Sequence, residues 1–185
     1  MKRKITEIAT VHSGIYAQSG VGRDLRYIQA RHFDQESKLS RIIIPELPLN
    51  EKTQRHLLQA GDILVSSKGG DYFAAEFEGE IGPAVASTTF LVLRLKGQDV
   101  LPQYLVWFLN HPQTQAWFET KSIGSAIQSI SKGILETLEV PIPSIEVQHR
   151  VLRIHELRNK ERLLRSRIEE QRERLIQQEI FNAIT

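Results

Sequence analysis

The chain is long enough for one ordinary domain and a further element, because it has 185 residues and 41% of them are hydrophobic. The absence of cysteine excludes a disulfide framework and a cysteine-ligated zinc site, and no stretch resembles a secretory leader or an apolar span of about 18 to 20 residues, so we expect a cytoplasmic protein without a membrane span. The formal net charge is only +2, but basic residues outnumber acidic ones in residues 1–45 and more weakly in 140–185. Such local density attracts phosphate, although ordinary solvated surface charge has the same signature.

The first part of the chain has the pattern of short strands. Residues 5–11 alternate apolar and polar side chains, as a half-buried strand does, and residues 25–30 predict a second strand. The other predicted strands lie at 42–44, 63–67 and 88–95, with a hairpin formed by 72–77 and 79–86. Asn50 is a candidate N-cap for a short helix over 51–59.

Helical patterns come later in the chain. Pro102 is expected to start a helix that ends at Leu109, and a second helix is expected over 113–121. Ser131 is a candidate N-cap for a short helix over 132–135. Because the strands precede the helices, the pattern predicts an α+β fold, with a β-rich domain whose sheet is antiparallel or mixed.

The last stretch predicts one long helix. After Pro143 there is neither glycine nor proline, and Ser144 is a plausible N-cap. Apolar residues then recur with heptad spacing, at Val147, Ile154, Leu157, Leu164, Ile168 and Leu175. The remaining positions of that seam hold Arg150, Glu161, Gln171 and Gln178. We therefore expect a domain over residues 1–140 and a long helix over 141–185.

Such a helix needs a partner for its seam. Forty residues of helix extend about 60 Å at about 1.5 Å per residue, and one small domain cannot cover a rod of that length. The apolar seam therefore predicts a coiled coil with another helix, while a helix folded back on its own domain is the alternative.

Catalytic motifs are scarce in this sequence. No glycine-rich phosphate loop is present, and His149 and His155 are six residues apart, which does not suit two metal ligands on one helical face. We therefore expect no cofactor and no metal. One weak alternative is a metal-dependent nuclease, since Glu36 and Lys38 form a Glu-x-Lys motif that follows Asp24.

Three polar or basic segments suit a nucleic acid, although each could equally be a merely soluble loop. Lys68 ends a predicted strand before two glycines, which allow a backbone to approach a ligand closely. Polar residues that suit base edges and phosphates surround the predicted helix start at Ser131. A basic, aromatic-containing stretch covers residues 23–32.

Several segments, in one order, resemble the specificity subunits of Type I restriction-modification systems. The most characteristic is Leu58-Gln59-Ala60-Gly61-Asp62-Ile63-Leu64-Val65-Ser66. The others are 86–95, 101–105, 122–125 with 130–131, 135–143 and 146–151. One departure is Val147, which separates Glu146 from Gln148 where the family often has adjacent Glu and Gln. The likeness extends over nearly the whole chain.

The resemblance implies a target recognition domain followed by a spacer helix. Members of the family read one half of a split DNA site with each such domain, and they carry no catalysis. They hold DNA methyltransferase subunits and, through them, the restriction subunit. A full-length member has two domains and two antiparallel spacer helices. This chain has one of each, so it is expected to be a half-length subunit that forms a homodimer, or a truncation.

These considerations lead to a specific set of expected contacts. The expected DNA-binding residues are Arg23, Arg26, Tyr27, Arg31, Lys68, Lys121, Ser125, Gln128, Ser129 and Lys132. The expected dimerisation residues are Val147, Ile154, Leu157, Leu164, Ile168 and Leu175. A homodimer would read an interrupted palindrome in double-stranded DNA. Besides the nuclease, a coiled-coil interaction module that does not bind DNA remains an alternative.

Overall fold

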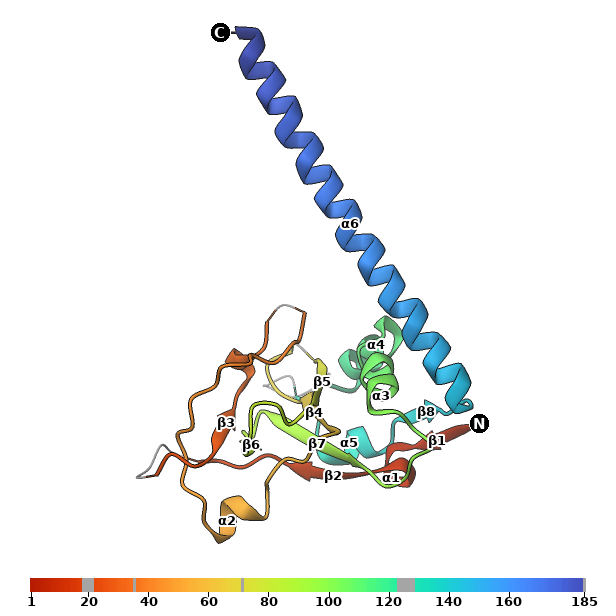
Figure 1. The fold of residues 1–185 in the computed structure, drawn as a ribbon. Helices are drawn as coiled ribbons and strands as arrows, with labels where there is room; N and C mark the ends of the chain where they lie inside the picture. Colours follow the sequence, from red (N-terminus) through yellow and green to blue (C-terminus); the bar gives the residue numbers. More distant parts are fainter. Residues whose placement is uncertain (18–21, 35, 71, 123–128, 185) are drawn as a thin grey trace. The chain divides into compact units, whose positions relative to one another are not determined.

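The computed structural model describes residues 1–17, 22–34, 36–70, 72–122 and 129–184. The chain divides into two compact units, Met1–Ile145 and Glu146–Thr185. The first is an α+β unit with antiparallel sheets and a parallel pair of strands, and the second is a long helix (Figure 1), so the predicted fold class is confirmed.

A four-stranded antiparallel sheet forms the centre of the first unit (Figure 1). Its strand order is β2 (Ala9–Ser13), β7 (Phe90–Leu95), β4 (Asp62–Ser66) and β5 (Ala74–Phe77). All five residues of β4 are buried, as expected for a central strand with both faces covered. The β-branched and aliphatic residues of β4 and β7 therefore supply most of the middle of the core.

Two small sheets complete the strands of this unit. β1 (Lys2–Lys4) pairs antiparallel with β8 (Glu139–Pro141), and β3 (Arg26–Ile28) pairs parallel with β6 (Ala84–Ala86). Side chains of β3 and β6 alternate between two hydrophobic clusters, since successive residues of a strand face opposite sides. Ile28 and Ala86 lie in one cluster with Leu64, Phe77 and Phe90. Tyr27 and Val85 lie in the other with Ile15, Leu25 and Leu47.

Short helices connect and cover the strands. They are α1 (Ile5–Ile8), a 3-10 turn (Ala30–His32), α2 (Glu51–Gln54), α3 (Pro102–Leu109), α4 (Pro112–Ser122) and α5 (Lys132–Glu136). Three local predictions are confirmed here. Asn50 accepts the Thr53 N–H at 3.0 Å, Pro102 occupies the first turn of α3, and Ser131 accepts the Ile134 N–H at 3.2 Å.

Three strand predictions are wrong. Residues 5–8 form α1, because Ile5 and Ile8 are both buried, and their spacing of three fits a helical turn. The segments over 72–86 form no hairpin, since β5 pairs with β4 and β6 pairs with β3. Within the described range 36–70, residues 42–44 are not a strand. Ile42 and Ile44 point into solvent there, with 86% and 73% of their surfaces exposed.

A buried ion pair joins β4 to β7. The Asp62 side chain is 1% exposed, and its carboxylate accepts from Arg94 Nε at 2.8 Å and from Arg94 Nη2 at 2.6 Å. The same carboxylate accepts the Gln59 N–H at 2.8 Å, and Arg94 also donates to the Leu57 carbonyl. This hydrogen bonding raises the pKa of Arg94. The pair explains why an aspartate begins a strand of buried aliphatic residues.

The second unit is α6 (Ile145–Ile184), a single helix of 40 residues. The predicted long helix is therefore confirmed, and it is drawn without interruption in Figure 1. None of the described helices combines the length and the hydropathy that crossing a membrane requires. The apolar side chains of the predicted seam are among its most exposed large residues, with Ile154, Leu164 and Leu175 at 59%, 57% and 60%.

Candidate nucleic-acid interface

Lys68 lies at the end of the central sheet where β4 stops. Ser67 fixes the backbone just before Lys68, because its N–H and its hydroxyl both donate to the Thr89 carbonyl at 2.9 Å. Gly69 and Gly70 follow with φ values of +97° and +85°, which L side chains rarely adopt. A side chain built on Gly69 would meet nothing within 4 Å, so the Lys68 loop borders open space.

A second segment joins Lys68 at this edge. Ser129 forms a β-bridge with Lys68, and the Ile130 N–H donates to the Ser67 carbonyl at 2.9 Å. Ser131 then caps α5, which places Lys132 at the first residue of that helix. Lys132 is exposed and 3.7 Å from Glu136. Three predicted residues far apart in the sequence, Lys68, Ser129 and Lys132, are therefore held together by backbone contacts.

Residues 33–34 and 36–39 form a paired segment, called here the hairpin, that packs against the same end of the sheet. Phe33 pairs with Leu39, and Asp34 closes the turn by accepting the Lys38 N–H at 2.9 Å. The Phe33 ring lies 5.0 Å from the Phe73 ring and 5.3 Å from the Phe90 ring. Because Phe90 is the register partner of Ser66 at the end of β4, this packing holds the hairpin near the Lys68 loop.

Arg31 belongs to the turn that opens this hairpin. Its side chain is exposed, and its Nε lies 3.4 Å from Nε2 of His32. Partial burial and the neighbouring Arg31 charge lower the pKa of His32. At neutral pH this imidazole is therefore mostly uncharged, and Arg31 supplies the positive charge of the segment.

The other residues of the basic stretch differ in exposure. Arg23 is exposed in the loop before β3. Arg26 is half-buried, and its Nη1 lies 2.9 Å from where a side chain on Gly82 would begin. Tyr27 is 6% exposed, and its hydroxyl donates to the Ile15 carbonyl at 2.8 Å. Tyr27 therefore belongs to the core and not to a surface that DNA can reach, because its neighbours cover the ring and its hydroxyl is used internally.

The last predicted residues lie beside residues 123–128 or within them. Lys121, in the final turn of α4, is exposed and lies 5.9 Å from the centre of the Trp117 ring. That distance suits a cation–π contact, which orients the ammonium group. Ser125 and Gln128 lie outside the described residues.

The nuclease alternative finds little support in the geometry. Lys38 donates to Glu36 at 2.6 Å on an exposed turn, which raises the pKa of Lys38. The Asp24 carboxylate accepts the Leu49 N–H at 3.0 Å in another loop. Across the described ranges, no group of three histidine, aspartate or glutamate side chains could hold a metal ion. Because Glu36 is already paired with Lys38 and Asp24 lies in another loop, these residues do not form the carboxylate cluster that binding of Mg²⁺ requires.

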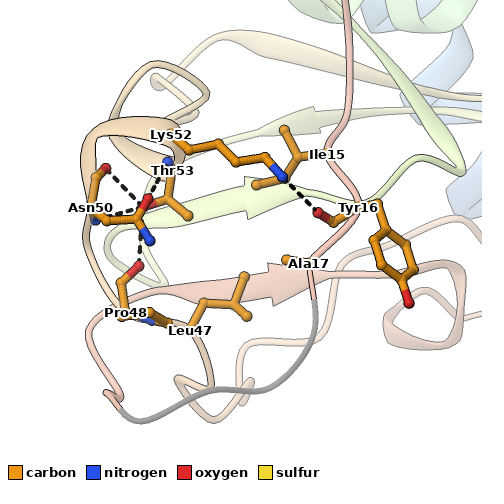
Figure 2. Close-up of a pocket in the computed structure, with 8 residues that line it drawn as sticks. All are labelled: Ile15, Tyr16, Ala17, Leu47, Pro48, Asn50, Lys52 and Thr53. Atoms are coloured by element: carbon orange, nitrogen blue, oxygen red, sulfur yellow. Dashed lines mark hydrogen bonds between the residues drawn. The ribbon is translucent and has the colours of Figure 1, made fainter.

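An open pocket that sequence reasoning missed lies beside α2 (Figure 2). Its volume is about 330 Å³, and Lys52 Nζ donates to the Tyr16 carbonyl at 3.4 Å at its rim. The lining residues are Ile15, Tyr16, Ala17, Leu47, Pro48, Asn50, Lys52 and Thr53. The Tyr16 carbonyl faces Lys52, whereas the Tyr16 ring is turned away from the other lining residues (Figure 2). The two lining segments are about thirty residues apart in the sequence, so no local sequence motif predicts this pocket.

Comparison with known proteins identifies a family. The family described as Type I restriction modification DNA specificity domain matches residues 2–171. A comparison with curated proteins gives no match.

Solved structures share the fold of this chain. One comes from work on complex assembly and conformational transition of the type I R-M system, with 15% identity and a TM-score of 0.60 over 87% of this chain and 38% of the other. A second is the Type-I restriction-modification system S subunit from M. genitalium, with 16% identity, a TM-score of 0.58 and coverage of 87% and 39%. A third is the HsdS subunit from Thermoanaerobacter tengcongensis, with 16% identity, a TM-score of 0.58 and coverage of 87% and 37%. The chain thus spans about two fifths of the length of these proteins.

Proposed function

Because the chain belongs to the family of Type I restriction-modification DNA specificity domains, we propose that it reads a specific DNA sequence for such a system and leaves the chemistry to partner subunits. The observation that carries the proposal is the convergence of Lys68, Ser129 and Lys132 at one end of the central sheet. The recognition domain is proposed to cover residues 1–140. It works in the cytoplasm, where it meets DNA.

The proposed DNA surface has two kinds of contact. Lys68 and Lys132 bind phosphates and set the position of the domain on the duplex, with Arg31 and Lys121 as outlying charges. Ser129, Ser125 and Gln128 are the proposed base contacts, because a hydroxyl or an amide both donates to and accepts from base edges in the major groove. Arg23 and Arg26 extend the positive surface along β3, whereas Tyr27 is left out of it.

The second unit, residues 141–185, is proposed to act as a spacer helix. Its seam pairs with a second helix, so that two recognition domains read two halves of a split site at a fixed separation. The methyltransferase subunits, and through them the restriction subunit, assemble on this frame. The homodimer expected from the sequence remains a prediction, and it would require an interrupted palindrome as the target.

The salt dependence of DNA binding tests this surface. Lys68→Ala and Lys132→Ala should each weaken binding to all sequences, because each removes a phosphate contact. Each should also reduce the slope of log K against log salt by about 0.9. Titration of labelled duplex DNA at several salt concentrations measures both effects, with the methyltransferase subunit present if the chain needs it.

Lys2→Ala is the matched control. Lys2 is an exposed lysine on β1, and β1 leads through α1 to the Leu95 end of the sheet, opposite Lys68. It should leave the slope unchanged. If the Lys68 and Lys132 variants also kept the natural slope, the proposed surface would be wrong. Absence of DNA binding by the natural chain with its methyltransferase would favour the interaction module that does not bind DNA.

A further inference from the structure

The turn between β6 and β7 presents two threonines at the end of the central sheet where β4 stops. Residues 87–90 form this turn, and the Phe90 N–H closes it by donating to the Ser87 carbonyl at 2.9 Å. Thr88 and Thr89 are its two central residues, and both are partly exposed. The turn contains no charged side chain, in contrast to the basic segments around it.

Neighbours on both sides place the turn in the middle of this end of the sheet. The N–H and the hydroxyl of Ser67 both donate to the Thr89 carbonyl, so the turn lies directly beside the Lys68 loop. On the other side the Gly14 N–H, just after β2, donates to the Phe90 carbonyl at 3.0 Å. Because β7 lies between β2 and β4, the two threonines occupy the centre of this edge.

A third neighbour brings the basic segment with Arg31 to the same place. The Ser87 N–H donates to the Ile28 carbonyl at 2.9 Å, at the end of β3, and Arg31 follows three residues later. The two segments that border the turn therefore carry cations, Lys68 in one and Arg31 in the other. In protein–DNA complexes phosphate contacts set the position of the protein, and base contacts specify the sequence. An uncharged tip between two basic segments suits that division, since the phosphates border the groove and the base edges form its floor.

The turn does not use the two threonine hydroxyls for its own structure. Its side-chain hydrogen bond comes from Ser87, whose hydroxyl accepts the Thr89 N–H at 3.4 Å. Among the residues that the structure describes, neither the Thr88 hydroxyl nor the Thr89 hydroxyl has a hydrogen-bond partner. Threonine favours extended strands over turns, so local propensity does not explain a pair of threonines here. Such a departure from local preference at the surface points to a function.

The backbone of the turn is already held in place for that function. A residue that reads a base loses less affinity when it is ordered before DNA binds. Thr89 meets this requirement, since its N–H and its carbonyl are both hydrogen-bonded within the domain. The next residue, Phe90, is 1% exposed and anchors the turn in the core.

We infer that Thr88 and Thr89 read an A·T pair in the major groove of the DNA target. The inference rests on the proposed function of the chain in DNA recognition, and it names residues that determine the sequence. A threonine methyl group packs against the C5-methyl group of thymine, and the hydroxyl bonds to thymine O4 or to the adenine amino group. The serine and glutamine side chains proposed above as base contacts carry no methyl group, so the threonines add a contact that those side chains do not supply.

Uracil in place of thymine tests the methyl contact without any change to the protein. The full chain with its methyltransferase subunit first selects a sequence from a random pool of duplex DNA. Each thymine of the selected half-site is then replaced by uracil, which lacks only the C5-methyl group. At one position the natural chain should bind about fourfold more weakly, the loss expected when one methyl group is no longer buried. A half-site without an A·T pair, or full affinity for every uracil duplex, would overturn the inference.

Two conservative variants assign the methyl contact to the turn. Thr88→Ser and Thr89→Ser keep the hydroxyls and remove the methyl groups, so at least one of them should bind the thymine and uracil duplexes equally. Neither should change the salt slope, because no phosphate contact is lost. Thr6→Ser is the matched control, since Thr6 is an exposed threonine on α1, at the opposite end of the sheet. It should keep the natural preference for thymine.

The outcomes separate this inference from the proposed function. If the natural chain selects a sequence and both turn variants keep its preference for thymine, the inference is wrong and the recognition role stands. If the natural chain selects no sequence, both are wrong. A turn that serves a protein partner instead would weaken assembly with the methyltransferase subunit in the variants and leave the thymine preference intact, which also overturns the inference.

Discussion

The Asp62–Arg94 pair should be the most sensitive polar point of the recognition domain. Asp62 is 1% exposed and receives three hydrogen bonds, from Arg94 Nε, Arg94 Nη2 and the Gln59 N–H, at 2.8, 2.6 and 2.8 Å. Asp62→Ala removes the acceptor of all three and leaves a guanidinium and a backbone N–H without their partner. The Arg94 side chain is 35% exposed, so water can reach part of it.

These contacts set the expected magnitude. Breaking a fully buried ion pair costs about 3 to 5 kcal/mol, and partial hydration of Arg94 lowers the figure to about 3 kcal/mol. Asp62→Asn keeps an acceptor oxygen for part of the network and should cost less than Asp62→Ala. Urea unfolding followed by circular dichroism measures the free energy of unfolding of each variant.

A double-mutant cycle isolates the pair from its surroundings. Arg94→Ala combined with Asp62→Ala should cost clearly less than the sum of the two single changes, since the second change removes a group already left unpaired. The reasoning would be refuted if Asp62→Ala lost less than about 1 kcal/mol, or if the two single effects simply added. Either result would mean that Asp62 begins β4 without anchoring it to β7.

Two further predictions concern the edge strand β5. Asn110 donates to the Ala74 carbonyl and accepts the Ala74 N–H, both at 2.8 Å, so it pairs with the strand as a neighbouring strand would. Asn110→Ala should therefore lower the free energy of unfolding by about 1 to 3 kcal/mol, and an unchanged urea midpoint would argue against this pairing. Burial, and to a smaller extent the nearby Glu78 charge, raises the pKa of Glu76 above the ordinary 4.5. A hydrogen bond from Gln103 opposes this shift but is the weakest of the three effects. The folded state thus penalises the charged form above the raised pKa, and the penalty disappears below 4.5. Glu76→Gln should stabilise the protein at neutral pH and lose that advantage in acid, as unfolding measured over a pH series would reveal, whereas a gain that persists in acid would contradict the assignment.

The helices could be predicted from local sequence more accurately than the pairing of the strands. Asn50, Pro102 and Ser131 act within their own turns, so their roles follow from a few neighbouring residues. The absence of glycine and proline after Pro143 was likewise enough to predict α6. The parallel pairing of β3 with β6 joins residues nearly sixty positions apart, and no local pattern encodes it.

In the candidate site, too, some features follow from local sequence and others depend on tertiary packing. Two glycines after Lys68 marked an open loop, but its bridge to Ser129 depends on tertiary packing. Tyr27 misled the prediction because a tyrosine in a basic stretch is equally suited to stacking and to a core. The Ile15 carbonyl that receives its hydroxyl is twelve residues away and was not predictable from the stretch itself.

The central claim is that this chain selects a DNA sequence through the surface around Lys68, Ser129 and Lys132. Selection from a random pool of duplex DNA, with the full chain and its methyltransferase subunit, tests the claim most directly. The account predicts enrichment of one split sequence with a fixed gap, and loss of that enrichment in the combined Lys68→Ala and Lys132→Ala variant. A pool that stays random with the natural chain, or the same enriched sequence from the variant, would contradict it.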